Sequence, residues 1–253
     1  MLKIENISIS YDNTQALKQF SLKANVGEIV ALIGPSGCGK STLLNALAGN
    51  ITNYTGEIKF FSEMDEMDRS INYKEKSLGL IAQDYGLLPW LKVEDNISLP
   101  LKIKKLKVKD YSSKIEHVMQ KLKIAHLRGR YPNQLSGGQK QRVSIAKTFI
   151  MKLDLLLMDE PFSALDSITR EQTQKLFLEI WEEYKPITLF VTHSAEEAVF
   201  LGTKIIIMSG PPGKIVSEIE NPIFKKAEGA EFYKMCNKIK SLVKLNAFRE
   251  EVG

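Results

Sequence analysis

The residues of this chain best suited to chemistry form a glycine-rich segment near its N-terminus, Gly34-Pro35-Ser36-Gly37-Cys38-Gly39-Lys40-Ser41. Its glycines let backbone N–H groups approach an anion closely, because no Cβ atom stands in the way. The ammonium group of Lys40 would neutralise phosphate oxygens, and the Ser41 hydroxyl is a group that can hold Mg²⁺ beside a nucleotide. The adjacent Thr42 can add a contact to the α-phosphate. The segment therefore predicts a phosphate loop.

A second glycine pair lies far downstream, within Leu135-Ser136-Gly137-Gly138-Gln139, and precedes a run of residues with helical spacing. An anion at a helix N-terminus meets unpaired N–H groups and the positive end of the helix dipole. Ser136 adds a hydroxyl at the same place. The chain thus carries two predicted phosphate-binding elements, and this pairing is its most informative feature.

Two carboxylates follow the apolar run Leu155–Met158, namely Asp159 and Glu160. Ligands of open α/β sheets bind at the carboxyl ends of parallel strands, where this run would deliver them. We expect Asp159 to hold Mg²⁺ through water and Glu160 to polarise the water that attacks the γ-phosphate. An apolar strand ending in acids is a weak signal by itself, and it becomes strong in a chain that also has a phosphate loop.

Two further polar residues, Gln83 and His193, also follow apolar runs. At such a strand end, His193 could donate a hydrogen bond to the γ-phosphate and contact the attacking water. The amide of Gln83 could touch Mg²⁺ and the same water. Taken alone, the histidine would be interpreted as structural and the glutamine as a surface residue.

These residues require strands and helices in alternation to bring them together, and the apolar patterns supply them. An α/β protein with a mostly parallel sheet is predicted. Strands are expected at residues 2–10, 28–33, 57–60, 78–82, 153–158, 188–191 and 205–208, and helices at 41–48, 167–184 and 195–201.

The stretch from about residue 84 to 150 interrupts this alternation. It contains no convincing strand, and helical spacing relates Val108, Tyr111, Ile115, Val118 and Leu122. We interpret it as a helical lobe inserted in the core of one domain that spans residues 1–253. A helical tail is expected at about 221–253, where apolar residues again recur at helical spacing.

Composition indicates a globular protein with a large core, since 43% of the 253 residues are hydrophobic and 26% charged. The net charge of +5 is too small to indicate a nucleic-acid partner. Residues 92–130 nevertheless contain eleven Lys or Arg and only four acids. A solvated lysine-rich face is the preferred interpretation, and a surface near anionic lipid or an acidic partner is the alternative. No apolar run is long enough to span a bilayer, and no signal peptide is recognisable.

The two cysteines, Cys38 and Cys236, have no metal-ligand spacing and are typical of a reducing cytoplasm. Cys38 lies within the phosphate loop, where N–H dipoles could favour its thiolate. The preferred interpretation is that it is simply a small residue that fits there.

In their order along the chain, these motifs resemble the ATPase subunit of an ATP-binding-cassette (ABC) transporter, over roughly residues 2 to 220. The resemblance implies a P-loop ATPase fold, with an N-terminal antiparallel β region beside the parallel core, and ATP and Mg²⁺ as ligands. It makes Gly34–Ser41 the Walker A motif, Leu155–Asp159 Walker B and Glu160 the catalytic carboxylate. Further roles implied are adenine stacking for Tyr11, the Q-loop for Gln83, the signature for Leu135–Gln139, the D-loop for Ser163-Ala164-Leu165-Asp166, and the switch for His193.

The same resemblance explains why one chain needs two phosphate sites. Two subunits of the family pair head to tail and clamp each ATP between the Walker A of one and the signature of the other. With every motif intact, a homodimer is favoured. The pair would lie on the cytoplasmic face of the membrane, against transmembrane permease subunits, with an extracytoplasmic solute-binding protein as an indirect partner and no nucleic acid.

The segments 83–97 and 210–215 are similar to the branch that imports nitrate, sulfonates and taurine. Trp90 and Leu88 would face the permease, or else belong to the core of the lobe. An exporter ATPase, a cassette ATPase acting on nucleic acid or ribosomes, and a nucleotide-sensing scaffold are the alternatives. Three departures from the family pattern are Ser194 where an acid is usual, Lys147-Thr148-Phe149 in place of an arginine-containing helix segment, and Lys152-Leu153 where a proline is usual.

Overall fold

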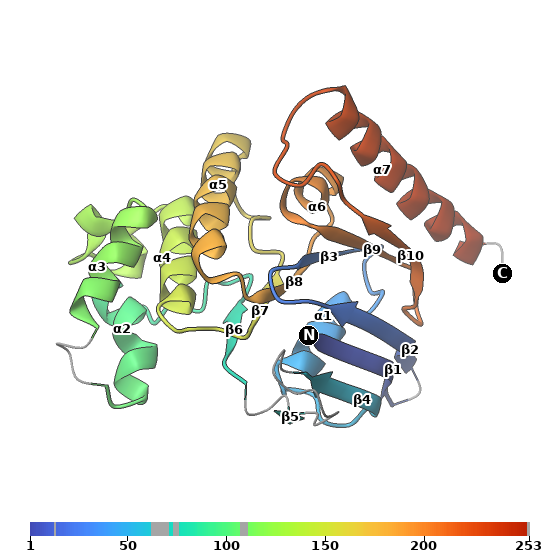
Figure 1. Cartoon of the computed structure of the whole chain (residues 1–253), viewed down its shortest axis with the longest axis horizontal. Helices are drawn as coiled ribbons and strands as arrows, with labels where there is room; N and C mark the ends of the chain where they lie inside the picture. The colour runs from blue at the N-terminus through green and yellow to red at the C-terminus, as the bar shows by residue number, and fades with distance from the viewer. Residues whose placement is uncertain (13, 62–70, 73–75, 107–110, 252–253) are drawn as a thin grey trace. The chain divides into compact units, whose positions relative to one another are not determined.

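The computed structural model of the protein describes residues 1–12, 14–61, 71–72, 76–106 and 111–251. The chain divides into two compact units (Figure 1). Unit 1 comprises Met1–Lys76 and Ile187–Gly253, and unit 2 comprises Ser77–Pro186.

Unit 1 contains an antiparallel sheet with the strand order β2-β1-β4-β5. Its strands are β1 (Leu2–Tyr11), β2 (Thr14–Ala24), β4 (Thr55–Phe60) and β5 (Ile71–Asn72). The apolar residues that predicted the first strand, Leu2, Ile4, Ile7 and Ile9, are all buried on β1. The N-terminal antiparallel region implied by the resemblance is therefore confirmed.

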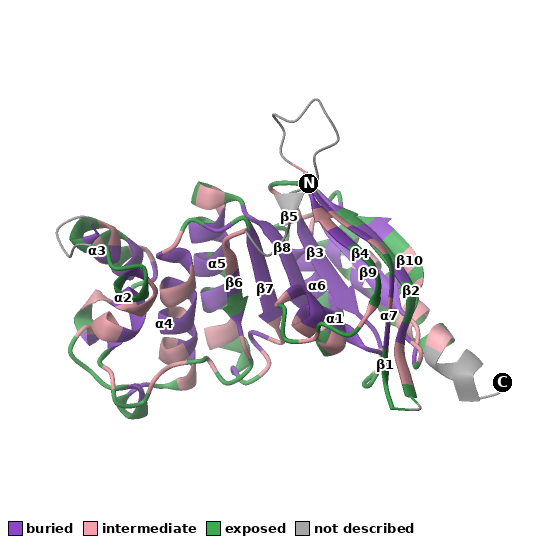
Figure 2. Cartoon of the chain, turned by 90° about the horizontal axis from the view of Figure 1, so that it is seen from below, coloured by how far each residue is buried: buried purple, intermediate pink, exposed green. Residues whose placement is uncertain are grey.

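Unit 1 also contributes the strands β3 (Ile29–Ile33), β8 (Ile187–Val191), β9 (Lys204–Met208) and β10 (Ile215–Glu220). They lie in the order β10-β9-β3-β8, with β3 parallel to both β8 and β9 and β10 antiparallel at the edge. Every residue of β3, β8 and β9 is buried, as Figure 2 shows, which is the pattern of a sheet covered on both faces. The helices of this unit are α1 (Lys40–Leu47), α6 (Ala195–Leu201) and α7 (Ala230–Glu251).

Unit 2 is built on two parallel strands, β6 (Leu78–Ile81) and β7 (Leu155–Asp159). Its helices are α2 (Val93–Ile103), α3 (Ser112–Lys121), α4 (Gly137–Phe149) and α5 (Ser167–Tyr184), with short 3₁₀ turns η3 (Ala125–Leu127) and η4 (Pro132–Gln134). Among the described residues between 84 and 150 there is no strand, as predicted.

The amphipathic helix predicted in the lobe is α3, and its apolar residues Tyr111, Ile115, Val118 and Leu122 are buried. Val108, the first residue of that pattern, lies outside the described residues. The strand predicted at 153–158 begins only at Leu155. Just before it, the backbone N–H of Ser77 donates a hydrogen bond to the Asp154 carboxylate and not to a backbone carbonyl, so the pairing with β6 extends no further toward residue 153.

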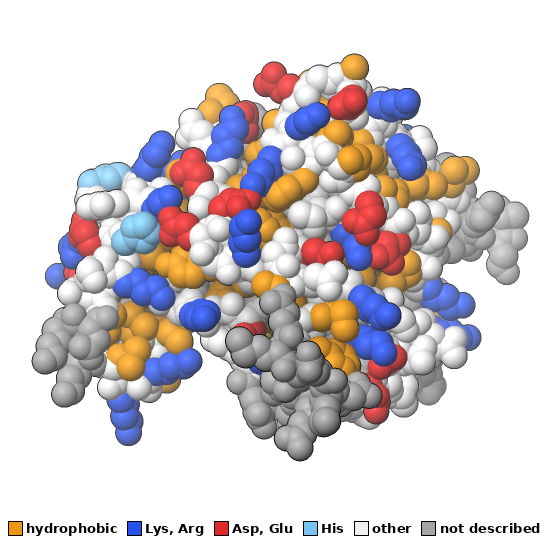
Figure 3. All heavy atoms as spheres, viewed as in Figure 1, with side chains coloured by type: hydrophobic (Ala, Val, Ile, Leu, Met, Phe, Trp, Pro, Cys, Tyr) orange, Lys and Arg blue, Asp and Glu red, His pale blue; other side chains and the backbone are white. Residues whose placement is uncertain are grey.

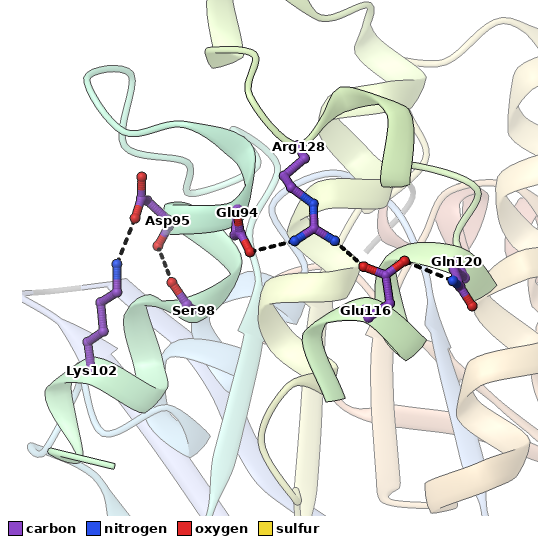
Figure 4. Close-up of polar contacts among 7 residues, drawn as sticks. All are labelled: Glu94, Asp95, Ser98, Lys102, Glu116, Gln120 and Arg128. Atoms are coloured by element: carbon purple, nitrogen blue, oxygen red, sulfur yellow. Dashed lines mark hydrogen bonds and ion pairs between the residues drawn. The ribbon is translucent and has the colours of Figure 1, made fainter. Parts of the chain in front are cut away.

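Three of the four acids within residues 92–130 form ion pairs with basic residues of the same segment (Figure 4). Arg128 pairs with both Glu94 and Glu116, which joins α2, α3 and the loop after η3, and Lys102 pairs with Asp95 on α2. On the face shown in Figure 3, Lys and Arg side chains are interspersed with acids rather than gathered in one patch. The mixed charges on this face support a solvated charged surface.

Candidate active site

The predicted phosphate loop connects β3 to α1 in unit 1, in the strand–loop–helix order that such a loop requires. Gly37 and Gly39 have φ angles of 78° and 86°, in the left-handed region that favours glycine. A Cβ atom at Gly39 would also lie 2.7 Å from the carbonyl oxygen of Ala16 and 2.7 Å from a methyl group of Leu17. The tight wrap of the loop therefore depends on glycine at this position.

The side chain of Lys40 is held inside this loop and is only 8% exposed. Its Nζ donates hydrogen bonds to the carbonyl oxygens of Gly34 (2.9 Å) and Pro35 (2.7 Å) and approaches the Cys38 sulfur at 3.4 Å. The ammonium group thus lies among the loop's own backbone, where phosphate oxygens would be bound. Ser41 and Thr42 follow in the first turn of α1, and Ser41 is exposed.

The Cys38 thiol is fully buried beneath the loop. Burial raises its pKa, and the nearby ammonium group of Lys40 offsets this only in part. The thiol form is therefore favoured over the reactive thiolate, which supports the interpretation of Cys38 as a small residue that fits its place.

Gly213 is a component of this loop's surroundings that sequence reasoning did not single out. A Cβ atom there would lie 2.0 Å from the carbonyl oxygen of Cys38, so the two backbones touch. Backbone hydrogen bonds fix Gly213 in place, from its N–H to Ala16 (2.8 Å) and from Lys18 to its carbonyl (3.1 Å). Its only sequence signal is the segment Gly210–Ile215, which was noted as a feature of the importer branch.

Strand register brings His193 to the same edge of the sheet as the phosphate loop. Leu32 on β3 pairs with Val191 on the parallel strand β8, so Gly34 and His193 each lie two residues beyond this pair. His193 is exposed there, and the flanking residues Thr192 and Ser194 are tied to the start of α6. Tyr11, at the end of β1, is 49% exposed and available for stacking.

The same argument places Gln83 beside the two carboxylates of unit 2. Ile81 on β6 pairs with Met158 on β7. Gln83 and Glu160 each lie two residues beyond this pair, and Asp159 directly precedes Glu160. Glu160 has a φ of 45°, an unusual conformation for a residue with a side chain. Its carbonyl oxygen accepts hydrogen bonds from the Ser163 hydroxyl (2.9 Å) and backbone N–H (3.2 Å), which hold it in this conformation. Such strain is concentrated at functional sites.

The predicted D-loop residues Ser163, Ala164, Leu165 and Asp166 run from this turn into helix α5. Asp166 is the N-cap of α5 and accepts a hydrogen bond from the backbone N–H of Thr169 at 3.0 Å. That hydrogen bond and a second one from the Thr169 side chain lower the pKa of Asp166. The segment is thus anchored at both ends.

The second glycine pair begins helix α4, as the sequence predicts. Ser136 is the N-cap residue. Its hydroxyl accepts a hydrogen bond from the backbone N–H of Gln139 (3.3 Å), and the Gln139 side chain accepts one from the N–H of Ser136 (3.0 Å). Leu135 is buried, while Gly138 has no room for a side chain because Thr169 lies 2.2 Å from the position of its Cβ. Gly137 and the exposed Ser136 hydroxyl are left at the surface of the unit.

The segment after Gln83 contacts this helix at two places. The Tyr85 hydroxyl lies 3.3 Å from where a Cβ of Gly137 would be, and Lys147 Nζ donates a hydrogen bond to the Gly86 carbonyl at 2.6 Å. Burial lowers the pKa of Lys147. The departure noted at this position therefore has a local role, which is to hold the backbone of the segment that follows Gln83.

Asn96 is a second residue that sequence reasoning missed. Its side chain is fully buried, accepts a hydrogen bond from the Leu88 N–H (2.8 Å), and donates to the carbonyl oxygens of Leu88, Leu91 and Lys92. The loop it holds presents Trp90, whose side chain is 69% exposed, while Leu88 is half-buried. Trp90 is therefore not a core residue.

None of the described helices combines the length and the apolar composition that crossing a membrane requires.

Comparison with known proteins places these features in a family. A family model described as "ABC transporter" matches residues 17–163, more than half of the chain. The aliphatic sulfonates import ATP-binding protein SsuB of Bacillus cereus is 39% identical over 225 residues, which cover 88% of this chain and 86% of that protein. The taurine import ATP-binding protein TauB of Escherichia coli (strain K12) is 38% identical over 222 residues, which cover 87% and 84% of the two chains.

Among solved structures, the fold is similar to that of the ATP-binding cassette MJ0796, reported as a dimer in a post-hydrolysis state bound to ADP and Pi. The TM-score is 0.70 and the identity 30%, over 90% of this chain and all of that one. The P-loop fold implied by the sequence motifs is confirmed by this similarity.

Proposed function

Since the chain belongs to the ABC transporter family of ATPases, we propose that it powers an importer, in which a separate permease forms the passage through the membrane. The observation that carries this proposal is the phosphate loop of unit 1, where Lys40 lies among backbone groups shaped for a nucleotide's phosphates. The direction of transport is inferred from the similarity to SsuB and TauB, both named as import proteins.

ATP is bound in this proposal by residues of unit 1. Tyr11 stacks on adenine, and the backbone N–H groups of Gly34–Ser41 surround the β-phosphate. Lys40 moves its hydrogen bonds from the Gly34 and Pro35 carbonyl oxygens to the β- and γ-phosphates, while Thr42 contacts the α-phosphate.

The donor set also fits Mg²⁺, because the Ser41 hydroxyl, the Asp159 carboxylate and the Gln83 amide all offer oxygen ligands. When bound, Mg²⁺ neutralises charge on the β- and γ-phosphates. Asp159 would hold the ion through water.

Hydrolysis is assigned to residues at the strand ends. Glu160 polarises the attacking water, and Gln83, two residues beyond the β7-paired Ile81, orients that water. His193 donates a hydrogen bond to the γ-phosphate from its exposed position after β8. In this proposal, Glu160, Gln83 and His193 act on the γ-phosphate and the attacking water while the phosphate loop holds ATP.

The second phosphate-binding element acts across a dimer. We assign Leu135–Gln139 of one subunit to the γ-phosphate of ATP bound by the other, and residues 163–166 to the contact between the two subunits. The dimeric state of the similar cassette MJ0796 supports this arrangement. One kind of chain suffices, since it carries every motif, so the dimer is proposed to consist of two copies.

Gly213→Ala is expected to weaken ATP binding by about 10- to 100-fold, because its Cβ would overlap the Cys38 carbonyl and displace the phosphate loop. Binding of a fluorescent ATP analogue measures the change. Gly129→Ala is the matched control, since a Cβ there meets no atom within 4 Å. Wild-type affinity in Gly213→Ala would show that the loop tolerates displacement.

Replacing Ser136 separates the two roles of its hydroxyl, helix capping and phosphate binding in trans. Ser136→Ala loses both, and we expect it to cost about 1 kcal/mol of stability and to lower turnover about 10- to 100-fold with little change in ATP affinity. Ser136→Asn keeps a capping side chain, so it should recover stability but not turnover. Ser136→Thr should recover both. Full turnover in the asparagine variant would contradict a role for the hydroxyl beyond the cap.

The permease is proposed to contact the segment 84–97. Its exposed Trp90 lies on a loop that Asn96 makes rigid, and an exposed aromatic on a rigid loop is a strong anchor for a partner. The link from Lys147 to Gly86 ties this segment to the signature helix α4, which offers a direct path from the permease to the ATP sites.

The transported solute is proposed to be a small sulfonate or a related anion, on the similarity to SsuB and TauB. A solute-binding protein outside the membrane would deliver it to the permease. The ATPase would then lie peripherally on the cytoplasmic face, where ATP is available.

Purification of the tagged chain from its native membranes tests this assignment. We expect a multi-helix permease to copurify, and the reconstituted complex with its binding protein to accumulate taurine or an alkanesulfonate in vesicles when ATP is supplied. Recovery of ribosomes or DNA in place of a permease would overturn the importer. A permease that expels the solute would make the chain part of an exporter.

A further inference from the structure

The C-terminal helix α7 packs against α6 within unit 1 (Figure 1), and α6 begins two residues after His193 in the chain. Phe232, Cys236 and Ile239 form the buried side of α7, each no more than 5% exposed. Burial raises the pKa of Cys236 to about 11, and the negative charge of Glu196 on α6 adds to this effect. The first turn of α6 and the middle of α7 are therefore in close contact.

A polar chain continues from this contact to the residues that flank His193. Lys240 on α7 forms an ion pair with one oxygen of the Glu196 carboxylate. The other oxygen of Glu196 accepts a hydrogen bond from the Ser194 hydroxyl at 3.1 Å. The carboxylate is thus a bridge between α7 and the residue next to His193.

Ser194 is fixed from several directions. Its hydroxyl also accepts a hydrogen bond from the Glu197 N–H (3.2 Å), so it is the N-cap of α6, and its own N–H donates to the Thr192 hydroxyl (3.0 Å). The Thr192 hydroxyl in turn donates to the buried Glu197 carboxylate at 2.6 Å. Both neighbours of His193 are therefore held, and the Ser194 hydroxyl hydrogen depends on Glu196 as its acceptor.

The ion pair contributes little to stability, because both side chains are about half exposed (51% for Lys240 and 49% for Glu196). Its effect lies in orientation. Partial burial favours the protonated form of Glu196, but hydrogen bonds from Lys240, the backbone and Ser194 lower its pKa overall, so the carboxylate stays charged. Without Lys240, this exposed carboxylate would be free to adopt other rotamers, and Ser194 would lose a fixed acceptor.

We propose that Lys240 is a positioning residue for ATP hydrolysis, acting through Glu196 and Ser194 on the placement of His193. The proposal assumes the role assigned to His193 above. It gives the C-terminal helix a function beyond packing. It also connects Ser194, which departs from the family pattern, to that helix through Glu196.

The test compares variants of the full chain in steady-state ATPase assays. Lys240→Met removes the charge and keeps the aliphatic stem, and we expect kcat to fall about three- to tenfold with KM for ATP unchanged. The melting temperature should change by less than about 2 °C, since the pair is exposed. Lys240→Arg should restore kcat. Lys238→Met, at an exposed position on the same helix, is the matched control and should behave as the wild type.

A double-mutant cycle separates coupling from a general effect on the helix. Glu196→Gln should lower kcat to a similar extent, and adding Lys240→Met to it should have no further effect. Unchanged kcat in Lys240→Met, an equal loss in Lys238→Met, or additive losses in the double variant would each overturn the proposal.

His193→Ala distinguishes this failure from a failure of the assigned mechanism. If His193→Ala hydrolyses ATP at the wild-type rate, the role of His193 is wrong. If it is inactive while Lys240→Met is unaffected, only the positioning role of Lys240 is wrong.

Discussion

The Glu160→Gln variant is expected to bind ATP as the wild type does and to hydrolyse it about 10²- to 10⁴-fold more slowly. Glutamine matches glutamate in size but cannot accept a proton from water, so only the hydrolysis step is affected. The backbone of residue 160 should keep its strained conformation, because the Ser163 hydrogen bonds go to the carbonyl oxygen and not to the side chain. Single-turnover hydrolysis and ATP binding, measured separately, check the result.

The same variant should accumulate as an ATP-bound dimer, since the step that opens the dimer is blocked. Size-exclusion chromatography with and without ATP shows this directly. Glu171→Gln provides the matched control, because Glu171 lies on the same unit, is exposed and pairs only with a surface lysine among the contacts described. Undiminished hydrolysis by Glu160→Gln would contradict the assignment of the catalytic carboxylate.

Lys40→Met should fail at an earlier step, with ATP binding weakened by about 10- to 150-fold. That range corresponds to the loss of charged hydrogen bonds worth about 1.5–3 kcal/mol. Methionine fills most of the volume of the buried lysine stem, so the effect reports the missing ammonium group rather than a cavity. Isothermal titration with ATP measures the affinity.

Lys23→Met, at an exposed position on β2, is the control for the removal of one positive charge from unit 1. Melting temperatures of all three proteins show whether the loop has lost its shape, because Lys40 also binds the carbonyl oxygens of Gly34 and Pro35. If Lys40→Met bound ATP normally, the ammonium group would serve only to hold the loop.

The elements nearest the candidate site could be predicted because their signals are local. Strands β3 and β8 are buried and almost entirely apolar, and the phosphate loop and His193 follow them within two residues. The capping residue Ser136 predicts the start of the helix that begins at Gly137. In these cases the chemistry and the structure that positions it lie within a few residues of each other.

Strand β2 was missed because its alternation is broken. Leu17, Phe20, Leu22 and Ala24 are all buried, but the first step between them is three residues, where Gln19 has a φ of 50° and the register with β1 shifts. Helix α2 lies within the predicted helical lobe, but its bounds could not be predicted, for a different reason. It contains Pro100 and begins after Lys92, which is not a capping residue. Strand β10 is an edge strand in which only Ile219 is buried, so it has no continuous apolar run.

Residues that act through distant contacts could not be found from the sequence. Gly213 matters because its backbone touches Cys38, and Lys240 because its ammonium group meets Glu196. Nothing near either residue in the chain indicates its partner. Lys147 was noticed only as a departure from a family pattern, and its bond to the Gly86 carbonyl explains what the lysine does there.

The contacts of Gly39 and Gly213 with neighbouring backbone have a thermodynamic consequence. Ordering the backbone of one residue costs about 1–2 kcal/mol of conformational entropy. In this loop, contacts with Ala16, Leu17 and Cys38 offset that cost during folding of the protein. The nucleotide therefore does not have to organise the loop on arrival. More of its interaction energy remains as affinity, and ATP can be exchanged in each transport cycle without the loop having to refold.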